Sequence, residues 1–168
     1  LTVFGEPHPE VAAMLDTLFS FAIPLLVVLN GFFVAIEFAL VTVRWTRIEQ
    51  LVEQNVLGAK TAQRTVENLQ DSLAACQLGI TVTSLALGWV GEPALEHMVE
   101  PFFLSLPTPW DKAVSHGIAI AIAFLIITYL HIVLGELVPR AIAIQHAERT
   151  VLLLSGPLLA FRTMTRPL

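Results

Sequence analysis

Residues 18–43 read LFSFAIPLLVVLNGFFVAIEFALVTV, an apolar run of 26 residues with few polar interruptions. About 20 apolar residues in a helix are enough to cross the hydrocarbon core of a bilayer. This stretch therefore predicts a membrane-spanning helix, and it decides the class of the fold.

Two further stretches predict membrane spans. Residues 113–138 form a second long apolar run. Residues 73–90 are shorter and more polar, which indicates a span packed against other helices rather than surrounded by lipid. Residues 151–161 are too short to span and contain Ser155-Gly156-Pro157, so they predict a re-entrant or interfacial helical segment. We expect an all-α membrane protein with three transmembrane helices, forming one domain over residues 1–168.

The composition excludes several other classes of protein. The chain is 55% hydrophobic and only 14% charged, too few charges to give several soluble helices a polar face. Nine Lys and Arg residues form no dense basic patch, so nucleic acid is not an expected partner. The single cysteine, Cys76, excludes an intrachain disulfide. We find no nucleophile–base pair, phosphate loop or zinc spacing, so the chain is not expected to be an enzyme.

The basic residues predict the orientation in the membrane. Eight of the nine lie between the first and second spans or after the third. Basic residues concentrate on the cytoplasmic side of membrane proteins, so we expect the N-terminus outside and the C-terminus inside. Residues 44–71, where Ile48, Leu51 and Val52 stand among charges, and residues 141–166 are then expected to form cytoplasmic juxtamembrane helical segments.

The third span ends in HIVLGELVPR, residues 131–140, which carries the most specific chemistry of the chain. Pro139 has no N–H, and its ring collides with the carbonyl four residues earlier, so the Gly135 carbonyl loses its helical hydrogen bond. Glu136 places a carboxylate beside this oxygen, and the negative end of the helix dipole also favours a cation. Such hard oxygen ligands suit magnesium, calcium or sodium rather than zinc or copper.

An alternative for Glu136 is an ion pair with Arg140, four residues later on the same helix. The pair would cap the helix near the membrane surface. It does not explain why Gly135 and Pro139 occur together, so the cation site is the favoured interpretation.

Polar residues in the other spans allow more than one interpretation. Gln77, Thr81 and Ser84 recur at helical spacing on one face, which fits either helix packing or a hydrophilic pathway. Asn30 and Glu37 share a face of the first span, whereas Thr42 lies about 120° away from Asn30 on an ideal helix. We therefore rank Asn30 and Glu37 below the Gly135 region. His131 is more simply explained by an interhelical hydrogen bond than as a ligand or proton relay.

Three ordered motifs resemble one known family. Residues 29–42, LNGFFVAIEFALVT, resemble the opening helix of the DUF21 transmembrane domain of the CorC/CNNM (cyclin M) magnesium transporter family. QLGIT at residues 77–81, with LALGW at 85–89, and the stretch from His131 to Pro139 resemble the later motifs of that family.

The resemblance implies a multi-pass homodimer in the plasma membrane that exports Mg²⁺, with Na⁺ as the coupling ion. In the family a largely dehydrated Mg²⁺ is bound near the cytoplasmic half of the membrane by a Ser on the first helix, an Asn or Ser on the second, and the Gly-Glu before the proline. Matched by motif, the metal ligands are expected at Thr42, Ser84, Gly135 and Glu136. The residues expected to support the site or line the pathway are Asn30, Glu37, Gln77, Thr81, His131 and Pro139.

A second function remains open: a magnesium-sensing membrane anchor that regulates a partner without transporting. Magnesium is preferred over calcium because of the resemblance, since the same oxygen ligands serve both ions. The family's cytosolic CBS module and C-terminal domain have no counterpart in these residues, so nucleotide binding is not expected.

Overall fold

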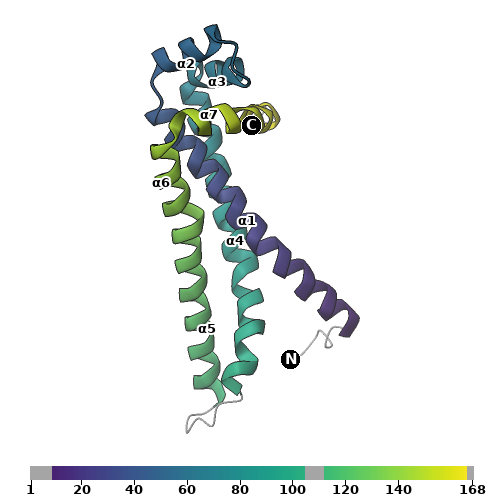
Figure 1. The fold of residues 1–168 in the computed structure, drawn as a ribbon. Coiled ribbons are helices and arrows are strands. Elements are labelled where there is room, and N and C mark those ends of the chain that lie inside the picture. Colours follow the sequence, from purple (N-terminus) through teal and green to yellow (C-terminus); the bar gives the residue numbers. More distant parts are fainter. Residues whose placement is uncertain (1–8, 105–111, 166–168) are drawn as a thin grey trace. The chain divides into compact units, whose positions relative to one another are not determined.

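The computed structural model describes residues 9–104 and 112–165 (Figure 1). All regular secondary structure in these ranges is helical, which confirms the expected all-α class. The chain divides into two compact units, one comprising Leu1–Leu26 with Ala86–Tyr129 and the other Val27–Leu85 with Leu130–Leu168. The candidate sites lie in the second unit.

Three long helical stretches account for the spans. Helix α1 covers Pro9–Thr42 and α4 covers Leu69–Leu104; α5 (Lys112–Leu130) continues through a π-helical segment (His131–Leu137) into α6 (Val138–Gln145). Within them, the stretches long and apolar enough to cross a membrane are Phe21–Thr42, Leu69–Gly91 and Phe124–Gln145. The prediction of three spans is confirmed. The third span runs past its predicted end at residue 138, because the helix continues through Pro139 rather than ending there.

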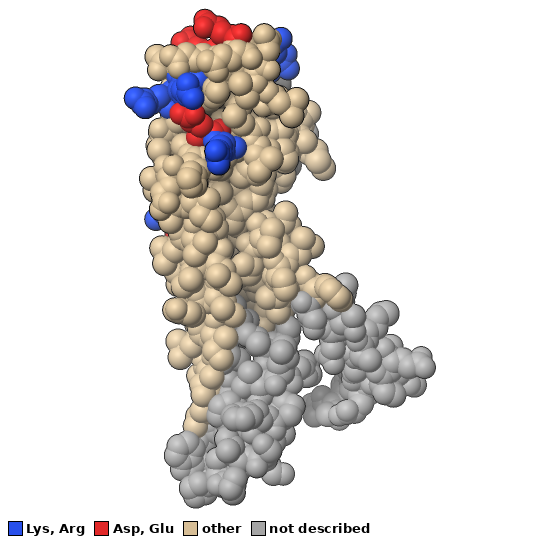
Figure 2. Space-filling model, viewed as in Figure 1, with Lys and Arg blue, Asp and Glu red and all other residues tan. Residues whose placement is uncertain are grey.

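The predicted juxtamembrane segments are helical too. Residues 44–71 contain the two short helices α2 (Trp45–Glu53) and α3 (Ala59–Glu67), and α7 (Ala147–Thr165) includes the short apolar stretch around Pro157. Apolar residues of α2 and small residues of α3 are buried, and α3 packs against both α2 and α7. Figure 2 shows the charged side chains of this unit gathered at the end that carries these helices. Which side of the membrane this end faces stays a prediction from the basic residues.

One hydrophobic cluster joins the juxtamembrane helices to the spans. Ile36 and Leu40 of α1, Ile48 of α2 and Leu158 of α7 are almost completely buried in it. The rings of Phe33 on α1 and Phe161 on α7 lie 4.9 Å apart in the same cluster. The end of the spans and the juxtamembrane helices therefore share a core, which fixes α1 and α4 against each other at the depth of the site described below.

Gly79 of α4 packs closely against Phe33 of α1. A Cβ added there would lie 2.5 Å from the Phe33 ring, closer than real carbon atoms pack. We expect Gly79→Ala to destabilise the protein by about 1–3 kcal/mol, because buried Phe33 must move. The measurement is unfolding of the purified protein in mixed detergent micelles with increasing SDS. Gly88→Ala is the matched control, since nothing lies within 4 Å of a Cβ at that position. Equal stability of the two variants would contradict the packing described here.

Candidate cation site

Asn30 joins the three spans at one point. The residue lies on α1 and is 2% exposed, so its amide must find partners within the protein. Its Oδ1 accepts hydrogen bonds from Thr83 Oγ1 of α4 at 2.8 Å and from Ser84 Oγ at 3.3 Å. Its Nδ2 donates to the Gly135 carbonyl oxygen at 3.1 Å and lies 3.2 Å from His131 Nε2. One amide side chain thus links α1 to α4 and to the π-helical segment.

Gly135 lies within the π-helical segment. Pro139 cannot donate to this oxygen, and the backbone immediately before it widens so that Val138 N–H donates to Val133 O, five residues back. Single π-helical turns of this kind occur frequently at functional sites. Gly135 itself is buried, and a Cβ there would lie 3.0 Å from His131 Cδ2 and 3.2 Å from Asn30 Nδ2. The absence of a side chain at 135 leaves room for the amide to reach the carbonyl.

Glu136 forms the local ion pair that the sequence left open as an alternative. Arg140 Nη2 lies 2.7 Å from Glu136 Oε1, and the guanidinium carbon lies 4.2 Å from the centroid of the Phe38 ring. The two charged side chains are 37% and 43% exposed on the surface of the single chain. Because Glu136 and Arg140 belong to the third span, their pairing lowers the cost of holding two charges there. A cation that binds Glu136 must therefore displace the Arg140 guanidinium.

The structure does not bring Thr42 together with the other three expected ligands. Thr42 is the last residue of α1, twelve positions after Asn30, a rise of about 18 Å along the helix. It lines a different surface cavity, together with Arg44 just after α1 and His146 between α6 and α7. Within one subunit, Ser84, Gly135 and the neighbouring Glu136 lie near Asn30, and Thr42 lies elsewhere.

The remaining expected residues occupy two places. His131 is part of the Asn30 network, with Ser84 Oγ 3.5 Å from its Nε2, and this fits the interhelical contact that was the simpler interpretation. Gln77 and Thr81 are exposed on α4, and Thr81 Oγ1 donates to the Gln77 carbonyl of its own helix. Glu37 is partly buried on α1, within reach of the Gln77 side chain and of the charge on Arg140.

Thr83 was missing from the expected site. It is 6% exposed, and its hydroxyl oxygen lies 2.8 Å from both Asn30 Oδ1 and the Gly79 carbonyl oxygen, two acceptors that share its single proton. Gln77, Thr81 and Ser84 share one face of this span, whereas Thr83 is turned about 100° away from Ser84 around the helix. The signal that points to it is the buried Asn30, whose carbonyl oxygen needs a donor from a neighbouring span.

The oxygens gathered here define the chemistry of the site. The Gly135 carbonyl, the Ser84 hydroxyl and the Asn30 amide meet in the buried network, whereas the Glu136 carboxylate, next in sequence, pairs with Arg140. All four are hard ligands, of which one is charged. Such a set suits a hard cation such as Mg²⁺, Ca²⁺ or Na⁺. No group of three or more His, Cys, Asp or Glu that could hold a metal occurs in the residues that the structure describes. The described site therefore lacks the ligand cluster typical of zinc or copper.

Comparison with known proteins identifies the family. The family model "Cyclin M transmembrane N-terminal domain" matches residues 21–168. The UPF0053 protein YhdT of Bacillus subtilis is 46% identical over 145 residues, covering 86% of this chain and 31% of YhdT. The UPF0053 protein YrkA of the same organism is 44% identical over 143 residues, covering 85% of this chain and 32% of YrkA. The uncharacterized protein Rv1841c of Mycobacterium tuberculosis is 41% identical over 143 residues, covering 85% of this chain and 40% of Rv1841c.

The chain thus spans about a third of the length of the Bacillus relatives. The family match covers all three spans and the juxtamembrane helices. On this evidence the chain belongs to the cyclin M (CNNM) transmembrane-domain family and is a multi-pass membrane protein.

Proposed function

We propose that this chain is the ion-conducting membrane domain of a magnesium transporter. It works as a homodimer in the plasma membrane, with its N-terminus outside, and exports Mg²⁺ by alternating access in exchange for Na⁺. Membership of the cyclin M family supports a role in metal-ion transport. The observation that carries the proposal is the buried Gly135 carbonyl, which accepts from Asn30 of the first span, while Ser84 of the second span bonds to the same Asn30 amide and Glu136 follows Gly135 in sequence.

Two groups of the protein already contact the oxygens that a cation would bind. The Asn30 N–H points its positive end at the Gly135 carbonyl, and the Arg140 guanidinium neutralises Glu136. A divalent cation bound to both oxygens would replace both groups. Binding is therefore an exchange, in which Mg²⁺ displaces one hydrogen bond and one exposed ion pair.

Asn30 can complete this exchange without leaving a polar atom unpaired. A half-turn of its amide brings Oδ1 towards the cation and Nδ2 towards the hydroxyls of Thr83 and Ser84, which can accept as well as donate. The amide would be a donor to Gly135 in the ion-free state and an oxygen ligand in the ion-bound state. This gives the site two self-consistent states, as alternating access requires.

The test of the function is transport by the full-length protein in liposomes. With Mg²⁺ inside and an opposing Na⁺ gradient outside, we expect Mg²⁺ to leave protein-containing vesicles and to stay in empty ones. Removing the Na⁺ gradient should slow the flux. Calorimetric Mg²⁺ binding without any flux would contradict the transporter and favour the second function, a magnesium sensor that anchors a partner.

Arg140→Gln tests whether the guanidinium competes with the ion. Removing the guanidinium frees the Glu136 carboxylate, so apparent Mg²⁺ binding should tighten by about two- to fivefold. Isothermal titration with Mg²⁺ measures this directly. Arg47→Gln is the matched control, because it breaks the equally exposed pair with Glu148, which is 3.0 Å long and lies in the juxtamembrane helices. Weaker or unchanged binding by Arg140→Gln would contradict the proposed exchange.

A further inference from the structure

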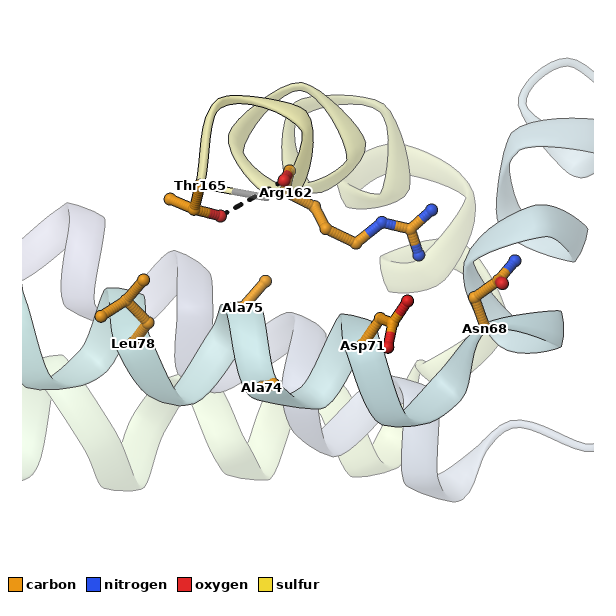
Figure 3. Close-up of a pocket in the computed structure, with 7 residues that line it drawn as sticks. All are labelled: Asn68, Asp71, Ala74, Ala75, Leu78, Arg162 and Thr165. Atoms are coloured by element: carbon orange, nitrogen blue, oxygen red, sulfur yellow. Dashed lines mark hydrogen bonds between the residues drawn. The ribbon is translucent and has the colours of Figure 1, made fainter. Parts of the chain in front are cut away.

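A second cavity lies apart from the cation site, between the beginning of α4 and the C-terminal half of α7. Its volume is about 360 Å³, and it is open on one side. Figure 3 shows the side chains around it. Asn68, Asp71 and Arg162 form a polar end, and Ala74, Ala75 and Leu78 continue the lining along α4.

The polarity of this cavity changes with depth in the membrane. The stretch that is apolar enough to span is Leu69–Gly91, so Asp71 lies near its beginning and Leu78 lies about 10 Å further along the helix. Small alanines between them leave the space open. The cavity is thus charged at the membrane surface and apolar below, as is a phospholipid with its headgroup above its acyl chains.

The two charged side chains at the polar end come from different helices, Asp71 from α4 and Arg162 from α7. Arg162 reaches across from α7 towards Asp71 (Figure 3), and its Nη1 donates to the buried Ser72 hydroxyl at 3.2 Å. That hydroxyl is itself fixed by the Thr65 and Asn68 carbonyls, each at 2.9 Å. In the part of the chain that the structure describes, neither Asp71 nor Arg162 forms an ion pair. A positive and a negative group therefore face one cavity without neutralising each other.

We propose that this cavity binds the headgroup of a phospholipid that carries a primary ammonium group. The guanidinium of Arg162 presents paired N–H donors that match a phosphate. The carboxylate of Asp71 accepts from the N–H groups of the ammonium. A trimethylammonium headgroup has no N–H to donate, and a glycerol headgroup brings no positive charge to Asp71. Phosphatidylserine also carries a primary ammonium, but it brings a second carboxylate next to that of Asp71, which repels it. The cavity thus favours phosphatidylethanolamine, independently of whether the protein transports magnesium.

The proposal is tested by native mass spectrometry of the full-length protein in detergent. The protein is titrated with phosphatidylethanolamine, phosphatidylcholine or phosphatidylglycerol of identical acyl chains. We expect phosphatidylethanolamine to bind about fivefold more tightly than the other two, the size of one ionic contact at a membrane surface. Asp71→Asn should abolish this preference, and Arg162→Gln should weaken the binding of all three lipids. Glu53→Gln and Arg64→Gln make the same charge changes at exposed positions outside the cavity, so they should leave the preference intact.

A third variant separates loss of binding from loss of fold. Ala74 is exposed in the cavity, so Ala74→Leu fills the space without removing a buried contact. It should lower phosphatidylethanolamine binding while the midpoint of thermal unfolding stays that of the wild type. Equal binding of the three lipids by the wild type, or an unchanged preference in Asp71→Asn, would overturn the proposal. So would variants that change the dimer fraction and not lipid binding, because the cavity would then hold a second copy of the chain.

Discussion

Glu136→Gln is expected to abolish magnesium flux and to weaken Mg²⁺ binding by at least about a hundredfold, or ~3 kcal/mol. Glu136 supplies the one charge among the four candidate ligands, since the others are a hydroxyl, an amide and the Gly135 carbonyl. Neutral ligands alone do not offset the dehydration of Mg²⁺, which gives up its water reluctantly. Calorimetry and vesicle flux measure the two losses in the same preparation.

Glu148→Gln is the matched control for this variant. Glu148 has the same exposed fraction as Glu136 to within one per cent, and it pairs with Arg47 at 3.0 Å in the juxtamembrane helices. Removing its charge should leave both binding and flux close to the wild type. If Glu136→Gln transported at the wild-type rate, the cation would not be bound at Gly135 and Glu136.

Changes at Asn30 are expected to have the next largest effects, and their directions differ. Asn30→Leu leaves the Gly135 carbonyl and the Ser84 hydroxyl without their amide partner, which should lower stability by about 1–3 kcal/mol and stop transport. Asn30→Asp keeps the shape but replaces the donor by a charged acceptor. With Mg²⁺ absent, its carboxylate repels the Gly135 carbonyl; with Mg²⁺ bound, it becomes a second anionic ligand.

Asn30→Asp should therefore bind Mg²⁺ more tightly than the wild type, by about tenfold, and release it more slowly. Calorimetry gives the affinity, and single-turnover flux gives the release rate. Thr42→Val is the comparison, because it removes a polar group from the same helix at a distance of about 18 Å from Asn30. Weaker binding by Asn30→Asp would show that the amide does not turn its oxygen to the ion. A large loss in Thr42→Val would place the site at the end of α1 instead.

The spans and the irregular helix at the third span could be predicted from the sequence because both follow from local rules. Apolar length determines whether a helix can cross the bilayer, and Pro139 disturbs the helix at Gly135 wherever the neighbouring helices lie. The pairing of Glu136 with Arg140 also follows from spacing along a single helix. This pair was the alternative to a cation site, and in the structure it engages the Glu136 carboxylate that a cation would bind.

The central position of Asn30 in the site could not be predicted from such local rules. The angular positions of residues on α1 indicate which ones share a face, but the depth at which α1 meets its neighbours depends on packing. That depth is set by Gly79 against Phe33 and by Gly31, where a Cβ would lie 2.9 Å from Pro139 Cγ. These contacts bring Asn30 level with Ser84 and Gly135.

Thr42 also shows that the helix face of a residue does not reveal which neighbours lie at its depth. The motif places it among the ligands, and angular position alone does not exclude it. The rise of about 1.5 Å per residue separates Thr42 from Asn30 by about 18 Å. Because Asn30 contacts Gly135, this separation keeps Thr42 away from the Gly135 carbonyl. Depth along the helix, as well as face, decides which polar residues of a span can meet.

The most direct test of the account is a crystal structure of the protein with Mn²⁺ in place of Mg²⁺, examined by anomalous scattering. We predict an anomalous peak within about 2.0–2.4 Å of the Gly135 carbonyl oxygen and of a Glu136 carboxylate oxygen. Asn30 Oδ1 should be turned towards the ion, and the Arg140 guanidinium should have left Glu136. A peak at another place, or a bound ion with Asn30 Nδ2 still 3.1 Å from the Gly135 carbonyl, would contradict the proposed exchange.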